Sequence, residues 1–376
     1  MLSKRIALLG VLAAIACAVT ASTAGASPSL MKGMYDDANL LTGNPDQNYA
    51  ILGDLRTKVV RLNLHWGGPL GVAGVDPTVR PTDPNDGQYD WSLYDRAVTY
   101  ATQYGIQVVF SIVNTPTWAN NGRGLRAAPT NMNNLRDFAY AAAKRYSGTF
   151  QRPQDGRFLP RVRYWLAWNE PNNPAWLSPQ ATRGRFVSPQ TYAKICNAVV
   201  TGIRTTLIAG NKIGCGVTAP RGNNNPRSSR PSMTPIAFLR GMKRYGAKGF
   251  DAYAHHPYYN FKNETPNTKP RGTTSITMGN IEVLDRELRK LYGAKRIWIT
   301  EYGYQTQPPR DAFGVTMAQQ AAYMRQAWTK AKRHPRIDMF TWFLLKDDTN
   351  LSGWQSGLMT PSWAKKPSYA AFKALR

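Results

Sequence analysis

Hydrophobic positions along this chain switch repeatedly between a period of two and a helical period. Short runs rich in β-branched and aromatic residues, typical of buried strands, occur near 30–35, 58–65, 107–114, 162–169, 212–218, 250–256, 296–301 and 339–345. Stretches with the helical period lie between or after them, near 48–55, 91–104, 131–146, 189–208, 235–245, 278–292, 317–332 and 368–375. Regular alternation of this kind predicts an α/β fold with a parallel sheet.

The number of strand–helix units chooses between two parallel-sheet architectures. Eight such units predict a closed (β/α)8 TIM barrel. The alternative is an open doubly wound sheet, but no G-x-G-x-x-G turn follows the first predicted strand. Because no long Ser/Pro/Gly linker interrupts the pattern, we expect a single domain over 27–376.

The second predicted strand has two different faces. One is apolar throughout, whereas the other becomes polar toward its carboxyl end: Val60, Leu62, Leu64 and Trp66 against Val59, Arg61, Asn63 and His65. Active sites of such barrels are built at the carboxyl ends of the strands. The polar face therefore predicts a contribution to a site, the alternative being a polar layer satisfied within the barrel core.

Two of the predicted strands end in a glutamate. The fourth leads into Trp168-Asn169-Glu170-Pro171, and the seventh leads into Thr300-Glu301. A carboxylate after an apolar run is costly unless it is hydrogen-bonded or functional. Two carboxyls that face one cleft are what glycosidic cleavage requires, because one protonates the leaving oxygen and the other attacks or supports the sugar carbon.

These motifs resemble those of clan A of the glycoside hydrolases, and the resemblance covers nearly the whole mature sequence. The Asn-Glu-Pro ending strand four is similar to the clan's acid/base motif, and Glu301 matches the nucleophile at the end of strand seven. The segment Thr115-Pro116-Thr117-Trp118-Ala119 is similar to one found in proteins related to families 5 and 39. The resemblance implies a retaining glycosidase that acts through a glycosyl-enzyme intermediate.

The resemblance also assigns roles to other residues. Asn169 is expected to bind the substrate 2-hydroxyl, and Tyr258, in His256-Pro257-Tyr258, is expected to contact the nucleophile. Arg61 matches an arginine on strand two. Trp342 matches the tryptophan beneath the sugar being cleaved, and in clan A a cis peptide often follows that residue, here Trp342–Phe343.

Aromatic and histidine side chains at strand ends have further possible uses. Trp118 and Trp342 are expected to contact sugar, whereas Trp66, Trp176 and Trp354 suit either sugar contact or loop packing. Trp91 and Trp328 are expected in the core. His65, His255 and His256 could bind zinc with a glutamate, but no H-E-x-x-H or similar spacing occurs. We expect them to hydrogen-bond the glutamates or sugar hydroxyls, with no metal or other cofactor.

The first 26 residues predict a secretory signal peptide. Lys4 and Arg5 precede a short apolar run, and a small-residue pattern ends at Ala26. We therefore expect a secreted, extracellular protein without membrane insertion. In that oxidising setting Cys196 and Cys215 could form a disulfide, the alternative being two buried thiols.

The net charge is +26, and it falls only to +24 when Lys4 and Arg5 are removed with the signal peptide. Export makes nucleic acid a poor partner, so the expected partner is a carbohydrate, and the expected state is a monomer. Basic residues crowd the predicted rim loops, which indicates an anionic glycan or simply a basic surface. They are Arg123, Arg126, Arg183, Arg185, Arg221, Arg227, Arg230, Lys262, Lys269, Arg271 and Arg310. Two alternative functions remain: a non-catalytic glycan-binding barrel, and an α-L-arabinofuranoside-acting member of the same clan.

Overall fold

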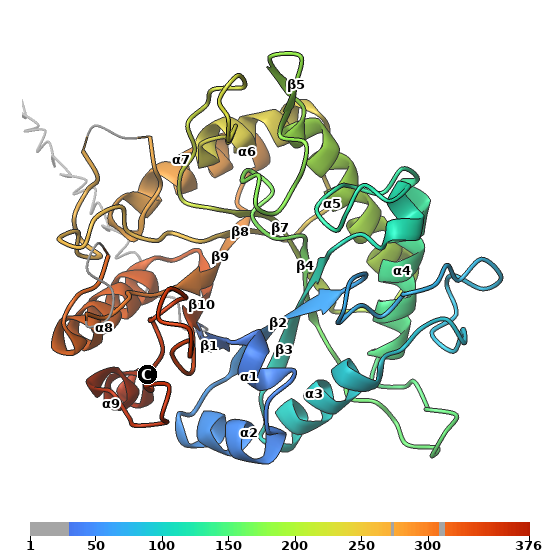
Figure 1. The fold of residues 1–376 in the computed structure, drawn as a ribbon, viewed down its shortest axis with the longest axis horizontal. Coiled ribbons are helices and arrows are strands. Elements are labelled where there is room, and N and C mark those ends of the chain that lie inside the picture. Colours follow the sequence, from blue (N-terminus) through green and yellow to red (C-terminus); the bar gives the residue numbers. More distant parts are fainter. Residues whose placement is uncertain (1–29, 272–273, 308–312) are drawn as a thin grey trace, which may run out of the picture.

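The computed structural model describes residues 30–271, 274–307 and 313–376, so the predicted signal peptide lies outside the described residues. Eight parallel strands close into a barrel in the order β1-β10-β9-β8-β7-β4-β3-β2, and helices surround it (Figure 1). The predicted (β/α)8 barrel is therefore confirmed. The barrel strands are β1 (Met31–Tyr35), β2 (Val59–His65), β3 (Gln107–Val113), β4 (Tyr164–Ala167), β7 (Lys212–Thr218), β8 (Ala252–His255), β9 (Arg296–Tyr302) and β10 (Ile337–Phe343).

The predicted helices are present, several of them begun by a proline or a capping side chain. They are α2 (Pro45–Asp54), α3 (Ser92–Gln103), α4 (Met132–Arg145), α5 (Ser188–Thr205), α6 (Pro235–Arg244), α7 (Ile281–Tyr292), α8 (Met317–Arg333) and α9 (Pro367–Ala374). The predicted helical stretch 278–292 is divided into the 3-10 turn η2 (Met278–Asn280) and α7. The pattern did not predict the short α1 (Asp37–Leu40), the 3-10 turn η1 (Thr117–Asn120), or the hairpin of β5 (Ala181–Thr182) and β6 (Arg185–Phe186).

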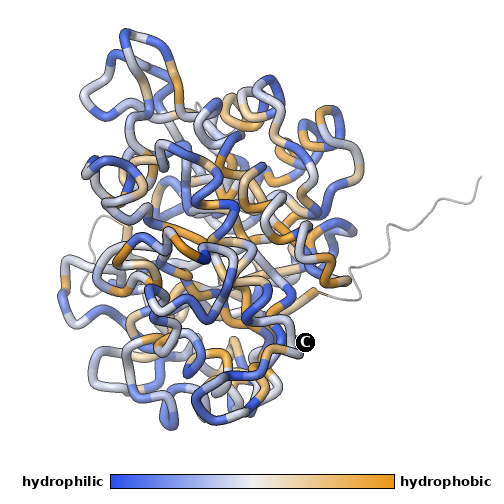
Figure 2. Tube along the Cα trace, turned by 90° about the vertical axis from the view of Figure 1, so that its right-hand side faces the viewer, coloured by the Kyte–Doolittle hydropathy of each residue, from blue (hydrophilic) through white to orange (hydrophobic). Residues whose placement is uncertain are grey.

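Side chains of the barrel strands divide between two apolar regions. The larger lies between the strands and the helices and includes Val60, Leu62 and Leu64 of β2, and Trp66 directly after it. The smaller lies inside the barrel and includes Val59, Leu166 and Met339. The predicted two-faced character of β2 is confirmed. Hydrophobic stretches of the chain gather toward the interior, and loop tips are mostly hydrophilic (Figure 2).

Cys196 of α5 and Cys215 of β7 form a disulfide, with their Cα atoms 6.0 Å apart. This resolves the two alternatives that the sequence left open. The bond ties a helix of the outer ring to a barrel strand. Just beyond it, β7 is irregular: its register with β8 shifts between Cys215 and Thr218.

The irregular end of β7 is hydrogen-bonded to the backbone that follows the neighbouring strand β4. Gly216 has φ +89°, and a Cβ atom there would lie 2.4 Å from the ring of Tyr253, so only glycine fits. Val217 follows with φ 45°, and its carbonyl accepts a hydrogen bond of 2.8 Å from the amide of Glu170, which itself has φ 36°. Such conformations persist only where the surroundings enforce them.

Candidate active site

A cavity of about 1050 Å³ lies at the carboxyl ends of the barrel strands. Residues in the last two positions of β1, β9 and β10 line it, together with residues within three positions after β4, β7 and β8. They are Tyr35, Glu301, Phe343, Asn169, Glu170, Ala219 and Tyr258. A second cavity, of about 800 Å³, lies beside α3 and the end of α4, and neither predicted catalytic glutamate lines it. The first cavity is therefore the candidate active site.

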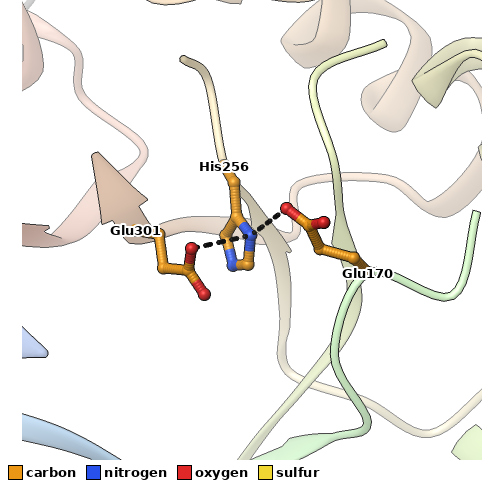
Figure 3. A group of neighbouring side chains, drawn as sticks. All are labelled: Glu170, His256 and Glu301. Carbon is orange, nitrogen blue, oxygen red and sulfur yellow. Dashed lines mark hydrogen bonds and ion pairs between the residues drawn. The ribbon is translucent and has the colours of Figure 1, made fainter. Parts of the chain in front are cut away.

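Glu170 and Glu301 face each other across His256 (Figure 3). One oxygen of each carboxylate and one ring nitrogen of His256 all lie within 4.8 Å of one another. The imidazole Nδ1 lies 3.0 Å from Glu170 Oε1 and 3.6 Å from Glu301 Oε2. The two glutamates that the sequence singled out thus converge on one cleft.

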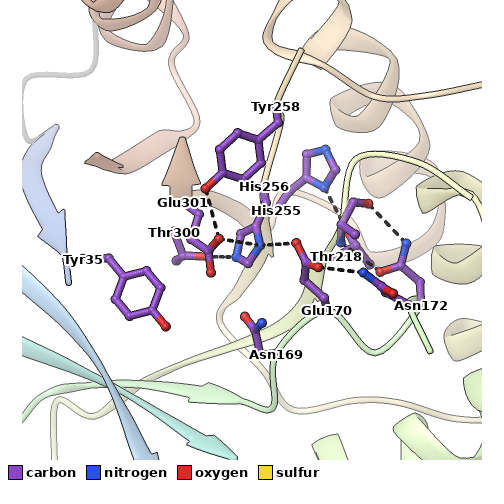
Figure 4. A network of polar contacts seen from close by, with 12 residues as sticks. Tyr35, Asn169, Glu170, Asn172, Thr218, His255, His256, Tyr258, Thr300 and Glu301 are labelled. Atoms are coloured by element: carbon purple, nitrogen blue, oxygen red, sulfur yellow. Dashed lines mark hydrogen bonds and ion pairs between the residues drawn. The ribbon is translucent and has the colours of Figure 1, made fainter. Parts of the chain in front are cut away.

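Arg61 and Tyr258 hold the Glu301 carboxylate from two sides. Arg61 Nη1 donates to Oε1 at 2.5 Å. The Tyr258 hydroxyl donates to Oε2 at 3.1 Å, as Figure 4 shows. The Arg61 side chain is fully buried, so this charge is poorly screened by water. Both contacts aim a hydrogen-bond donor at a carboxylate oxygen, so they hold the Glu301 side chain in one orientation.

Glu170 has a different environment. Burial raises its pKa to about 6, although a hydrogen bond from Asn173 and the positive charges of Arg61 and Arg221 oppose the rise. Asn173 Nδ2 donates to Oε2 at 3.0 Å. The protonated form of Glu170 is therefore populated at mildly acidic pH, because desolvation disfavours the charged carboxylate.

The proton of His256 can be assigned from its neighbours. Burial lowers its pKa to about 3, so the ring is neutral near pH 6. Its Nε2 lies 3.3 Å from Arg61 Nη1, which can only donate, and 3.0 Å from the Thr300 hydroxyl. Nε2 is therefore the acceptor, and Nδ1 carries the proton and donates to Glu170.

The adjacent His255 is the opposite tautomer, and its hydrogen bonds stabilise the fold and do not involve the glutamates. Its Nε2 donates to the carbonyl of Ile276 at 3.0 Å, and its Nδ1 accepts from the Thr218 hydroxyl at 2.9 Å. Burial lowers its pKa to about 3 as well. It joins the end of β7 to a loop and has no bond to either glutamate among the described residues.

Asn169 is oriented by Arg61. Its Oδ1 accepts from Arg61 Nη2 at 2.6 Å, which fixes the amide group because arginine cannot accept. Asn169 lines the cavity, and its NH2 group has no hydrogen-bond partner within 30–271, 274–307 and 313–376. That group can donate to a hydroxyl of a bound sugar.

Arg61 and His256 contact the glutamates without lining the cavity, and three other predicted site residues do not line it either. Trp342 is fully buried on the outer face of β10, where its indole donates to the Ser356 carbonyl at 2.9 Å. Trp118 is half-buried against Trp66, with its indole bonded to the Ala73 carbonyl at 3.0 Å. His65 bonds Asn114 at 2.8 Å and lies 3.8 Å from Asp37.

The position of Trp342 corrects the expectation that it lies beneath the sugar. Successive side chains of a strand point to opposite faces, so the residue that enters the cavity is its neighbour Phe343. Trp354, on the following loop, also lines the cavity and packs on Phe343 with ring centroids 5.4 Å apart. The expected cis peptide at Trp342–Phe343 is wrong too, since Ser178–Pro179 is the only cis bond in the described parts of the chain.

Sequence reasoning missed several residues of the cavity. Tyr35, at the end of β1, accepts from Asn63 Nδ2 at 2.7 Å and lies 4.5 Å from the Arg61 guanidinium. Its place at a strand end was the signal that could have identified it. Trp176 and Trp354 line the cavity, Trp66 is buried in the core, and the prediction of Trp91 and Trp328 as core residues is confirmed.

Glu170, His256 and Glu301 are also close enough to hold a metal ion. Arg61, however, places a fixed positive charge 2.5 Å from Glu301 and 3.3 Å from His256 Nε2. A divalent cation at this point would be repelled by the guanidinium. These three side chains therefore suit two carboxyl groups, each hydrogen-bonded to its own neighbours, better than they suit a metal centre.

A family model matches this sequence over residues 89–376. The chain belongs to DUF5722, a family of unknown function. The DUF5722 match includes Glu170, His256 and Glu301, whereas β1 and β2, with Tyr35 and Arg61, precede it. No curated protein matches the sequence of this DUF5722 member.

Solved structures of glycoside hydrolases resemble this DUF5722 chain in fold. A family 39 glycoside hydrolase from Bacteroides cellulosilyticus WH2 has a TM-score of 0.62 at 17% identity, over 92% of this chain and 62% of its own. A monomeric beta-xylosidase from Caulobacter crescentus CB15 has a TM-score of 0.61 at 18% identity, over 93% of this chain and 68% of that one. Fungal beta-1,4-galactanases have a TM-score of 0.57 at 14% identity, over 92% and 99%.

The chain therefore spans less than two thirds of the family 39 enzyme that it resembles. At these identities the likeness shows the fold. In fold, the likeness confirms the resemblance to clan A barrels, including those of families 5 and 39.

Proposed function

We propose that this protein is a retaining O-glycosyl hydrolase in which Glu170 is the acid/base and Glu301 the nucleophile. The observation that carries the proposal is the separation of the two carboxylates, whose nearest oxygens lie within 4.8 Å. Retaining enzymes hold their carboxyls about 5–5.5 Å apart, whereas inverting enzymes leave about 6.5–9.5 Å for a water molecule. The glycosidase neighbours, named as xylosidase, glucosidase and galactanase, support a carbohydrate substrate.

The different contacts of the two glutamates assign the nucleophile and the acid/base to different residues. Glu301, paired with Arg61 and Tyr258, attacks the anomeric carbon as a carboxylate. Glu170 gives its proton to the glycosidic oxygen, so the bond to the leaving sugar breaks as the bond to Glu301 forms. Glu170, now ionised, then takes a proton from water, whose oxygen attacks the anomeric carbon and releases Glu301 as a carboxylate.

Hydrolysis of a panel of aryl glycosides and defined polysaccharides tests the proposal. Glu301→Ala should abolish turnover, because no covalent intermediate can form. Glu170→Ala should spare aryl glycosides with good leaving groups far more than natural glycosides, and azide should partly restore its activity. Wild-type rates on natural glycosides from Glu170→Ala would contradict the assignment of that residue.

Stereochemistry tests the mechanism separately. NMR of freshly formed product should show retention of the anomeric configuration, because two displacements at one carbon restore it. Initial inversion would rule out double displacement, whichever residues carry it.

The same panel addresses the alternative functions. A non-catalytic glycan-binding barrel would bind polysaccharides without releasing sugar, and an α-L-arabinofuranoside-acting enzyme would hydrolyse the aryl α-L-arabinofuranoside of the panel. Two carboxyl groups that converge on one cleft and have different hydrogen-bond partners favour catalysis over binding alone.

We also propose that the enzyme is secreted, acts in polysaccharide degradation outside the cell, and works as a monomer. The features of 1–26 support secretion, and the disulfide is of a kind that persists in oxidising compartments. Within the described residues, no helix has the length and apolarity needed to span a bilayer. Mass spectrometry of the culture medium should find a mature chain that starts near Ser27.

The glycan is proposed to carry negative charge. The mature chain is strongly basic, and the charged residues that line the cavity besides Glu170 and Glu301 are arginines. A cleft with one sign of charge concentrates ligands of the opposite sign.

A further inference from the structure

The wall of the active-site cavity has two chemically different parts. Around Glu301 it is aromatic: Tyr258 bonds the carboxylate, and Trp354 packs on Tyr258 with ring centroids 5.3 Å apart. Around Glu170 it is polar and basic, formed largely by the loop that follows β7. Among the described residues, Arg221 and Arg230 of this loop are the only charged side chains of the wall other than the catalytic glutamates.

The basic part of the wall is held in place by hydrogen bonds. Asn172, two residues after Glu170, accepts from the Ala219 amide at 2.9 Å and donates to the Met233 carbonyl at 2.9 Å, so it clamps both ends of the loop. Arg221 Nη2 donates to the Tyr259 carbonyl at 2.7 Å. Further along, Asn223 Nδ2 donates to the Arg230 carbonyl at 3.0 Å.

Few of the basic residues that the sequence placed at the rim line the cavity in the structure. Of the basic residues expected there, Arg221 and Arg230 line the cavity, whereas Arg227, on the same loop, lies against Gly184 of the β5–β6 hairpin. Arg310 lies outside the described residues. Within the part of the chain that the structure describes, these two are the only residues of the predicted basic rim that line the cavity.

We propose that Arg221 and Arg230 form a subsite that binds an anionic sugar residue on the leaving-group side of the scissile bond. The proposal rests on the proposed function, because Glu170 protonates the oxygen that joins the leaving group, and Arg221 is the arginine of the wall whose charge acts on Glu170. A guanidinium fork suits a carboxylate or a sulfate ester through paired hydrogen bonds. The aromatic part around Glu301 holds the uncharged ring face of the sugar under attack.

Binding is measured with Glu301→Gln, which keeps the cavity but cannot turn over. Affinity electrophoresis compares a uronic-acid polysaccharide panel with its carboxyl-reduced forms, and a sulfated panel with its desulfated forms, at physiological salt. A preference in the first comparison identifies a carboxylate, and one in the second identifies a sulfate. On the preferred acidic glycan, a further Arg221→Gln or Arg230→Gln change should weaken binding about tenfold, as expected for a charge-assisted hydrogen bond.

Arg227→Gln is the matched control, because it removes the same charge from the same loop outside the cavity. It should weaken binding less than about twofold, since only screened long-range attraction is lost. Arg221→Lys should bind at an intermediate level, since it keeps the charge and loses the fork.

Equal losses from Arg221→Gln and Arg227→Gln would overturn the subsite, and so would equal binding of every acidic glycan and its neutral form. Neither result touches the proposed glycosidase activity, which is decided by hydrolysis with the wild type. Arg221 and Arg227 are both exposed, so their replacement should leave the fold intact. The unfolding midpoint of each variant verifies this.

Discussion

Arg61 contacts the proposed nucleophile and three other residues of the candidate site from a position without access to solvent. Its guanidinium bonds Glu301 and Asn169, lies 3.3 Å from His256 Nε2, and stacks near Tyr35. A buried ion pair of this kind is costly to break on one side, because the remaining charge loses its partner.

We therefore expect Arg61→Gln to lower the free energy of unfolding by about 3–5 kcal/mol. Urea denaturation measures this. Arg240→Gln is the control, because Arg240 is exposed and its pair with Glu287 should contribute no more than about 1 kcal/mol. Equal losses from both variants would contradict the role of Arg61 as the charge partner of the site.

The pKa of Glu170 predicts how activity depends on pH. The acid must be protonated before the first step, and burial raises its pKa to about 6. As pH rises through about 6, the protonated fraction of the free enzyme falls, and kcat/KM on natural glycosides should fall about tenfold per pH unit above it. Aryl glycosides with good leaving groups need little protonation, so their profile should lack this limb. A common limb on both substrates would assign it to another group.

At the scale of single elements, the loop after β10 extends the aromatic surface that Phe343 begins at the end of the strand. Trp354 is 41% exposed, lines the cavity, and packs on Phe343 and Tyr258. Trp354→Ala should raise KM about three- to tenfold, because an aromatic contact contributes about 0.5–1.5 kcal/mol. Leu351→Ala, on the same loop and outside the cavity wall, should leave KM unchanged. Steady-state kinetics on an oligosaccharide would show the difference.

The disulfide between α5 and β7 encloses a short segment, with the two cysteines 19 residues apart. Replacing both with alanine should lower the free energy of unfolding by about 3 kcal/mol, since the unfolded chain regains the freedom that the cross-link removes. Chemical denaturation with and without reductant tests this. The wild type should lose about the same amount on reduction, and the double variant should not respond. A reductant effect on the double variant would point to another cause.

At the scale of the whole molecule, the sequence predicted the barrel because hydrophobic period is a local property. The alternation along β2 placed Arg61 on the inner face, and glutamates directly after apolar runs marked the ends of β4 and β9. These features need no knowledge of distant contacts. The convergence of Glu170 and Glu301 followed from the barrel itself, in which the carboxyl ends of all strands meet at one face.

Features set by distant contacts could not be predicted in this way. The orientation of Trp342 depends on the register of β10, and a shift of one residue exchanges it with Phe343. The pairing of Cys196 with Cys215 depends on how α5 lies on β7. Arg221 was one of many basic loop residues, and only the folded loop distinguishes it from Arg227.

The hydrogen bond from the Glu170 amide to the Val217 carbonyl has a consequence for protein engineering. It attaches the backbone of the proton donor to a neighbouring barrel strand, next to a kink that only Gly216 permits. The spacing of the two carboxylates is then a property of the barrel, and the loops above them can be exchanged without altering it. Segments grafted from other barrels could therefore redirect this scaffold to new glycans, provided that Gly216 and its strand are left intact.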